Sequence, residues 1–111
     1  MLAALKAGGA PKLDLMVFDM CLMAQLETAY EIEGLADIMV GSEAVEPGDG
    51  WPYDEILSGL STDKLMLPQA LASMIVDKYG KSYNGGSQGT GNVTLSALSL
   101  ANLAPFMAEI G

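Results

Sequence analysis

An apolar segment followed by an amphipathic one constrains the fold of this chain most strongly. Residues 13–18 are nearly all apolar, which predicts a strand buried on both faces of a parallel sheet. In the next segment Leu22, Leu26 and Ala29 fall at helical spacing, and Gly34 ends the pattern. Residues 37–43 read as a second strand. Strand, helix and strand in this order form a right-handed parallel crossover, so the sequence predicts an α/β fold.

The rest of the chain predicts further helices and one more strand. Breaker and turn residues delimit helices over residues 1–7, 52–60 and 68–80, and Asn102 is placed to cap a last helix. The glycine-rich stretch 84–91 is typical of a flexible linker or of a mobile flap near the site. Residues 92–100 alternate well enough for a third strand. We therefore expect one domain with three mostly parallel strands and flanking helices.

Three strands with both flanks open make an incomplete sheet, because unpaired strand edges promote association. The first strand is hydrophobic and would lie at such an edge. We expect the 111-residue chain on its own to be marginally stable or self-associating.

Charge limits the partners of the protein. The sequence has 14 acidic and 5 basic residues, for a formal net charge of -9. This charge repels nucleic acid and anionic membrane surfaces, and an acidic cleft suits a cationic ligand. No apolar run approaches the roughly 18 to 20 residues of a membrane span. We expect neither a nucleic acid nor a membrane as a partner.

Cys21 is the one cysteine of the chain, and the sequence contains no histidine. It lies where the first predicted strand gives way to a predicted helix, and the positive end of a helix dipole favours a thiolate. The carboxyl ends of parallel strands are also where α/β folds place their sites. Cys21 is therefore a candidate nucleophile, and a small buried hydrophobe is the alternative.

Two aspartates are candidates for binding a cation. Asp19 lies two residues before Cys21, so on a strand both side chains would point to the same side, roughly 6 to 7 Å apart. Its carboxylate could pair with a guanidinium or an ammonium group, although it could instead stabilise the start of a helix. Asp49 lies on the loop after the second strand, where an ordinary turn residue is the alternative.

The string around these residues resembles the clostripain family of cysteine peptidases. The resemblance rests on residues 18–23 (FDMCLM), 26–31 (LETAYE), 42–43 (SE), 46–53 (EPGDGWPY) and 94–98 (TLSAL). It implies a caspase-like α/β/α sandwich that cleaves peptide bonds after arginine or lysine through a Cys-His dyad. Cys21 matches the nucleophile, and Asp19 matches an aspartate of the pocket for the basic residue.

The resemblance also implies what this chain lacks. The histidine of the family lies in a His-Gly motif on a preceding strand, which would lie upstream of Met1. Residues 1–111 would then be a single partial peptidase domain, without the histidine-bearing N-terminal part and inactive alone. The resemblance allows secretion, although the chain shows no signal peptide.

No cofactor is required by the sequence, and calcium is the one that the resemblance suggests. Glu43 and Glu46, together with Asp49, could offer oxygens to Ca²⁺, although their spacing lacks the alternation of an EF-hand loop. They could equally be solvated loop carboxylates. Trp51 and Tyr53 are expected to pack this loop against the sheet.

Three functions remain open from the sequence. The first is an endopeptidase acting on peptides or proteins with basic residues. The second is a non-catalytic caspase-like module that binds basic peptides or serves in assembly. The third is an unrelated doubly wound ligand-binding domain in which Cys21 belongs to the core.

Overall fold

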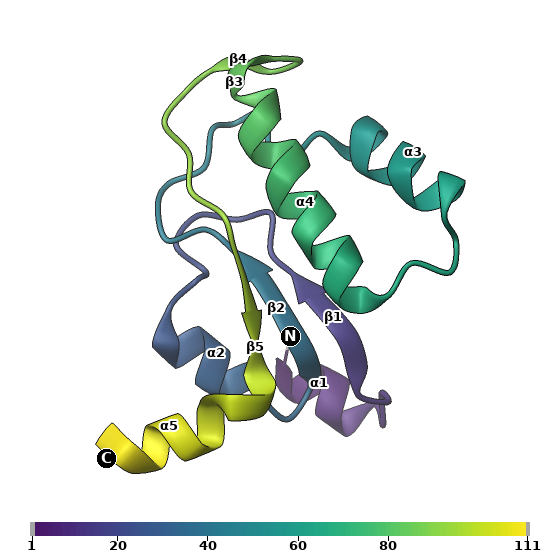
Figure 1. Ribbon diagram of the computed structural model, residues 1–111. Helices are drawn as coiled ribbons and strands as arrows, with labels where there is room; N and C mark the ends of the chain where they lie inside the picture. Colours follow the sequence, from purple (N-terminus) through teal and green to yellow (C-terminus); the bar gives the residue numbers. More distant parts are fainter. Residues whose placement is uncertain (1, 111) are drawn as a thin grey trace.

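A three-stranded sheet lies between helices in the computed structural model, which describes residues 2–110 (Figure 1). The strand order is β1 (Leu13–Val17), β2 (Ala36–Gly41) and β5 (Ser96–Ser99). β1 and β2 are parallel, with Leu13 opposite Ala36, whereas β5 runs antiparallel to β2. The predicted α/β class and the crossover between the first two strands are confirmed.

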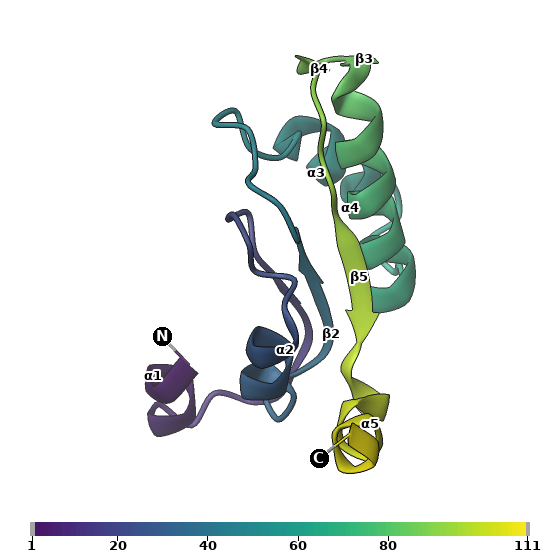
Figure 2. The ribbon, with the colours of Figure 1, turned by 90° about the vertical axis from the view of Figure 1, so that its left-hand side faces the viewer.

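Helices cover both faces of this sheet (Figure 2). α1 (Leu2–Ala7) and α2 (Leu26–Ile32) lie on one side, and α3 (Tyr53–Thr62) and α4 (Pro68–Ser82) on the other. A 3₁₀ turn, η1 (Leu100–Asn102), leads from β5 into α5 (Leu103–Ile110). No helix within residues 2–110 is long and apolar enough to cross a membrane.

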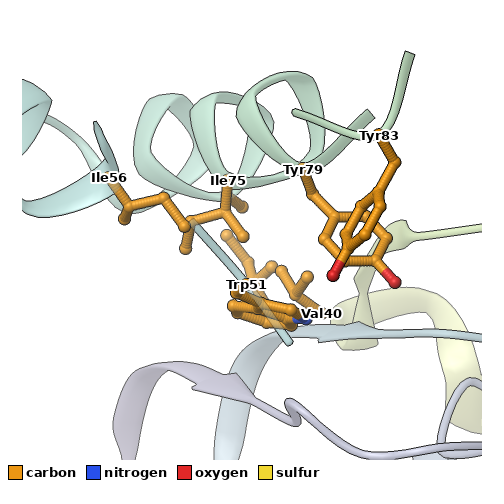
Figure 3. Close-up of a cluster of buried hydrophobic side chains, with 8 residues drawn as sticks. Val40, Trp51, Ile56, Ile75, Tyr79 and Tyr83 are labelled. Atoms are coloured by element: carbon orange, nitrogen blue, oxygen red, sulfur yellow. The ribbon is translucent and has the colours of Figure 1, made fainter. Parts of the chain in front are cut away.

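β2 is the central strand, and it is buried on both faces. Ile38 and Val40 face α3 and α4, where they pack with Trp51, Ile75 and Tyr79 (Figure 3). Met39, which lies between them on the strand, belongs to the cluster on the opposite face. Because successive side chains of a strand alternate between faces, one strand supplies both apolar cores.

Two prolines set the starts of α3 and α4. Pro52 immediately precedes α3, and Pro68 is the first residue of α4, where its missing N–H would have no helical partner in any case. Ala72, Ile75 and Tyr79 form the buried stripe of α4. The helix continues to Ser82, two residues beyond the predicted end at Gly80.

The prediction of a flexible linker over residues 84–91 is wrong, because the segment forms a hairpin. β3 (Asn84–Gly86) pairs with β4 (Gly89–Thr90). Gly85 and Gly89 adopt positive φ angles of 73° and 88°, which glycine tolerates without strain. The side chain of Gln88 bonds to Ser82 and to the carbonyl oxygens of residues 49 and 50, so distant contacts order the segment.

β1 differs from the doubly buried strand that the sequence predicts. Met16 is buried, but Val17 is 41% exposed and Asp14 faces solvent. The reason is that β1 is the edge of the described sheet, with β2 as its paired neighbour. Among residues 2–110 no strand pairs with the outer edge of β1, as the sequence predicts.

This edge predicts self-association of the 111-residue chain, and a charge on it should reduce the effect. We expect analytical ultracentrifugation to show concentration-dependent association, and Val17→Lys to weaken it at least about threefold. Leu65→Lys is the control, since Leu65 is 91% exposed in the loop between α3 and α4. A monomeric, cooperatively melting wild-type chain would contradict this expectation.

Candidate active site

The loop that carries Cys21 is held against the segment that follows β2. The N–H of Phe18 donates to the carbonyl of Val40 at 2.9 Å, that of Leu22 to Ala44 at 3.1 Å, and that of Ala24 to Ser42 at 2.9 Å. The backbone beyond β2 therefore continues as a hydrogen-bonding partner for residues 18–24.

Gly41 makes this close approach possible. A Cβ atom at Gly41 would lie 3.2 Å from the backbone nitrogen of Ala24. Ser42, which follows it, is fully buried and shares a 3.1 Å hydrogen bond with the hydroxyl of Thr94. The position of the Cys21 loop is thus set by buried, non-local contacts.

The predicted placement of Cys21 at a helix start is wrong. α2 begins at Leu26, and Cys21 lies in a turn between β1 and that helix. Leu22 has a φ of +59°, which a right-handed helix does not allow. The helix dipole therefore does not act on the thiol. The N–H groups of Leu22 and Ala24 already donate to carbonyls. They are therefore not free to stabilise the negatively charged oxygen that forms when a thiolate attacks a carbonyl.

The backbone of Glu46 contacts the thiol instead. Cys21 is exposed, and its Sγ accepts a hydrogen bond from the Glu46 N–H at 3.2 Å. A donor at this position stabilises negative charge on sulfur, which is the form that attacks carbonyl carbon. The interpretation of Cys21 as a core residue is wrong, because the side chain faces solvent.

Asp19 lies just beyond β1, in the loop rather than on the strand. Its Oδ2 accepts hydrogen bonds from the Tyr53 hydroxyl at 2.7 Å and from the Trp51 N–H at 3.4 Å. Gly50 passes so close that a Cβ there would lie 2.9 Å from the same oxygen. The carboxylate of Asp19 is therefore oriented by the loop that follows β2.

Glu46 lies at the centre of this arrangement. Trp51 donates from Nε1 to Glu46 Oε1 at 3.3 Å, whereas Glu46 Oε2 is buried without a hydrogen-bond partner. Burial raises the pKa of Glu46 to about 7, and interaction with the carboxylate of Asp19 adds to the increase. The carboxyl of Glu46 therefore keeps its proton up to near neutral pH.

The sequence suggested Glu46 only as a weak calcium ligand, and its place beside Cys21 was missed. The turn over residues 47–50 is a signal for this placement. The N–H of Gly50 donates to the carbonyl of Pro47 at 3.0 Å, which closes a turn over residues 47–50. A tight turn brings the residues on either side of it together. Recognising the turn would have placed Glu46 next to Trp51.

Trp51 and Tyr53, at the end of this loop and the start of α3, have different roles. Trp51 is 3% exposed, so its predicted packing role is confirmed. Tyr53 is half exposed, and burial together with the hydrogen bond to Asp19 raises its pKa to about 12. Its hydroxyl therefore stays protonated at neutral pH and remains a donor to Asp19, a role that the sequence did not indicate.

Neither Asp49 nor Glu43 makes a side-chain hydrogen bond or ion pair with another described residue. Asp49 is exposed in the turn, where its carbonyl oxygen accepts a 3.1 Å hydrogen bond from Gln88. Glu43 is exposed and lines a separate hollow with Val76 and Thr94. Within residues 2–110, no group of three or more acidic, cysteine or histidine side chains is placed to hold a metal ion.

An exposed thiol beside paired carboxyls, at the carboxyl end of a strand in an α/β fold, is the kind of site that a thiol hydrolase could use. Comparison with known families is more specific. The model of the Clostripain family matches residues 1–111, and the chain belongs to this family.

Solved structures of cysteine proteases have the same fold. A Bacteroides fragilis cysteine protease matches with a TM-score of 0.75 and 26% identity, over 94% of this chain and 43% of its own. A clostripain from Bacteroides thetaiotaomicron, in complex with the peptide inhibitor BTN-VLTK-AOMK, matches with a TM-score of 0.75 and 25% identity, over 98% and 46%.

A secreted C11 cysteine protease from B. thetaiotaomicron, in complex with an irreversible peptide inhibitor, matches at 30% identity and a TM-score of 0.75, over 96% of this chain and 31% of its own. The chain thus spans less than half the length of these relatives. Among curated proteins no match is found.

Gly50 should be hard to replace. Its φ is +66°, and a side chain would press on the carboxylate of Asp19. We expect Gly50→Ala to lower the free energy of unfolding by about 1–3 kcal/mol, measured by urea denaturation. Gly48→Ala, in the same turn but with open space around it, is the control. If both substitutions lowered the free energy of unfolding equally, the close approach of Gly50 to Asp19 would be contradicted.

The raised pKa of Glu46 should make stability fall as pH rises. The pKa of Glu46 is about 7 in the folded state, whereas its ordinary value is 4.5. Between these two pH values the folded state therefore holds more protons than the unfolded state. The stabilisation is complete at low pH and is lost as pH rises through about 7. We expect Glu46→Gln to flatten the loss of unfolding free energy between about pH 5 and pH 8.

The control for this measurement is Glu43→Gln, which alters an exposed carboxyl of the same loop. It should keep the wild-type dependence on pH. A Glu46→Gln protein that loses stability over this range as steeply as wild type would show that the pKa of Glu46 is not raised in the folded state.

Proposed function

We propose that this chain carries the nucleophile and the substrate pocket of a cysteine endopeptidase that cleaves peptide bonds after arginine or lysine. The observation that carries the proposal is the exposed thiol of Cys21, hydrogen-bonded to the N–H of Glu46, with the oriented carboxylate of Asp19 two residues away. Membership of the clostripain family supports the reaction class.

The chemistry follows from the thiolate. Sγ of Cys21 attacks the carbonyl carbon of the basic residue, and the carbonyl electron pair moves to oxygen. Collapse of this intermediate breaks the C–N bond, leaves a thioester on Cys21 and releases an amine that takes up a proton. Water then attacks the thioester, which releases the carboxylic acid product and restores the thiol.

Asp19 would bind the basic side chain. Its Oδ2 is held by Tyr53 and Trp51, and a carboxylate fixed in this way offers a bidentate partner to a guanidinium group. Asp49 is the second pocket candidate, on the turn that carries Gly50. The ion pairs within residues 2–110 are Lys12–Asp37 and Lys81–Asp77, so neither aspartate has a lysine partner among the described residues.

The general base would come from outside these 111 residues, since the sequence contains no histidine. The chain spans 43% and 46% of two related proteases, which leaves room for a histidine-bearing N-terminal part of the same domain. β1, whose outer edge is unpaired among the described residues, is a suitable place for that part to pair.

The substrate class is also suggested by a relative. The inhibitor in complex with the B. thetaiotaomicron clostripain carries the sequence VLTK, which ends in lysine. A calcium requirement stays a prediction from the family resemblance. Within the described residues, Glu43, Glu46 and Asp49 do not form a metal-binding group.

The test joins this chain to its upstream coding sequence and measures hydrolysis of arginine and lysine esters. Cys21→Ala should abolish turnover, because it removes the proposed nucleophile. Asp19→Asn should raise KM for basic substrates by about tenfold or more, since a charge-assisted contact is lost. Hydrolysis that survives in the Cys21→Ala protein would end the proposal.

A second candidate function is a non-catalytic module that binds basic peptides, which the absence of histidine favours. An upstream reading frame without a His-Gly motif would support it, as would a Cys21 thiol that reacts with iodoacetamide no faster than free cysteine.

A further inference from the structure

We infer that Gln88, in the turn of the β3–β4 hairpin, is a positioning residue of this site, which acts through the peptide between Gly50 and Trp51. It holds the carbonyl of that peptide, and the N–H of the same peptide donates to the carboxylate of Asp19. The inference rests on the proposed function and extends it to a residue that the sequence did not indicate.

The side chain of Gln88 reaches from the hairpin to the loop that follows β2. Its Nε2 donates to the carbonyl oxygens of Asp49 at 3.1 Å and of Gly50 at 3.0 Å. Its Oε1 accepts a hydrogen bond from the hydroxyl of Ser82 at 2.8 Å. Two carbonyl oxygens can be satisfied only by the NH2 end of the amide, so the partners of this side chain fix its orientation.

The hairpin that carries Gln88 is fixed to the end of α4 (Figure 1). The backbone N–H of Gln88 donates to the carbonyl of Ser82 at 3.0 Å, and that of Gly91 donates to Tyr83 at 2.9 Å. Gly86 lies so close to this helix end that a Cβ atom there would come within 2.9 Å of the Cα atom of Ser82. Because Ser82 is buried, the amide of Gln88 is held from the core of the molecule.

The carbonyl oxygen of Gly50 accepts a second hydrogen bond. The hydroxyl of Tyr83, the residue that follows α4, donates to it at 2.7 Å. Tyr83 is itself buried and packs edge-on against Tyr79, with ring centroids 5.2 Å apart (Figure 3). Both lone pairs of this carbonyl oxygen are therefore used by side chains that the end of α4 and the hairpin hold in place.

The peptide between Gly50 and Trp51 connects this contact to Asp19. A trans peptide is planar, and its C=O and N–H groups point in opposite directions. A carbonyl held by Gln88 therefore sets the direction of the Trp51 N–H, which donates to Asp19 Oδ2 at 3.4 Å. This hydrogen bond is already long, so a small rotation of the peptide plane would break it.

Gly50 does not fix the orientation of this peptide by itself. Its φ is +66°, and glycine adopts positive and negative φ angles with similar ease. The orientation therefore depends on the partners of the peptide, which are Gln88 and Tyr83 on the carbonyl side and Asp19 on the N–H side.

The test compares a lysyl ester with the norleucyl ester, which has the same carbon chain without the charged group. The protein is this chain joined to its upstream coding sequence. Gln88→Glu keeps the shape of the side chain but places an oxygen where two carbonyls need a donor. We expect the ratio of kcat/KM values, lysyl over norleucyl, to fall about fivefold, mainly through KM for the lysyl ester. Hydrolysis of the norleucyl ester should stay within about twofold of wild type.

Tyr83→Phe removes the other donor to the same carbonyl and should lower the ratio about threefold or more. Should one of these two variants not fold, the other decides. Ser87→Ala is the control in the hairpin, because the exposed Ser87 hydroxyl donates to Glu55 of α3 rather than to the loop that follows β2. It should keep the wild-type ratio.

Three results would overturn the inference and leave the proposed function standing. The first is a folded Gln88→Glu or Tyr83→Phe protein with the wild-type ratio. The second is an equal loss on both esters, which would indicate general damage to the fold. The third is a Ser87→Ala protein that loses the preference for lysine as strongly as Gln88→Glu. A wild-type protein with no Cys21-dependent hydrolysis would overturn both the inference and the proposed function.

Discussion

Burial of Trp51 is the constraint on which the site depends. The indole packs beside Val40 of the central strand and edge-on to Tyr79 of α4, with ring centroids 6.3 Å apart (Figure 3). Its two N–H groups then reach out of the core to Asp19 and Glu46. Loss of such a side chain costs about 3–5 kcal/mol in a well-packed core. The apolar core between the sheet and α4 thus orients the acids beside Cys21.

The nucleophile is positioned by backbone pairing rather than by a helix end. Beyond β2 the chain continues as a partner for the Cys21 loop, through carbonyls of Ser42 and Ala44 and the N–H of Glu46. Gly41 lets the two segments approach, and Ser42 is tied to Thr94 in the approach to β5. Three distant stretches of sequence therefore fix one thiol, and this arrangement suits a site that must keep its geometry in solvent.

Much of the fold could be predicted from local patterns. The apolar run of β1, the stripe of α2 and the apolar residues of β2 predicted the crossover, because period and composition are local properties. Pro52 and Pro68 gave the helix starts for the same reason. Residues 84–91 could not be predicted, because Gln88 orders them through bonds to residues far away in sequence.

The site was predictable in part. Cys21 and Asp19 could be found because they follow a strand and match a family motif. The helix start at Cys21 could not be excluded, because the local pattern shows neither the positive φ of Leu22 nor its hydrogen bond to the distant Ala44. Glu46 was not singled out beside Cys21, since its neighbours Asp19, Cys21 and Trp51 converge only in the folded chain.

The central claim is that Cys21 is a nucleophile placed next to a site for a positively charged side chain. Its most direct test is covalent labelling of the chain joined to its upstream sequence, with a lysyl acyloxymethyl ketone and with its uncharged norleucyl counterpart. Mass spectrometry should find the adduct on Cys21, and the lysyl reagent should react at least about tenfold faster at neutral pH. Equal rates for the two reagents, or no adduct on Cys21, would contradict the claim.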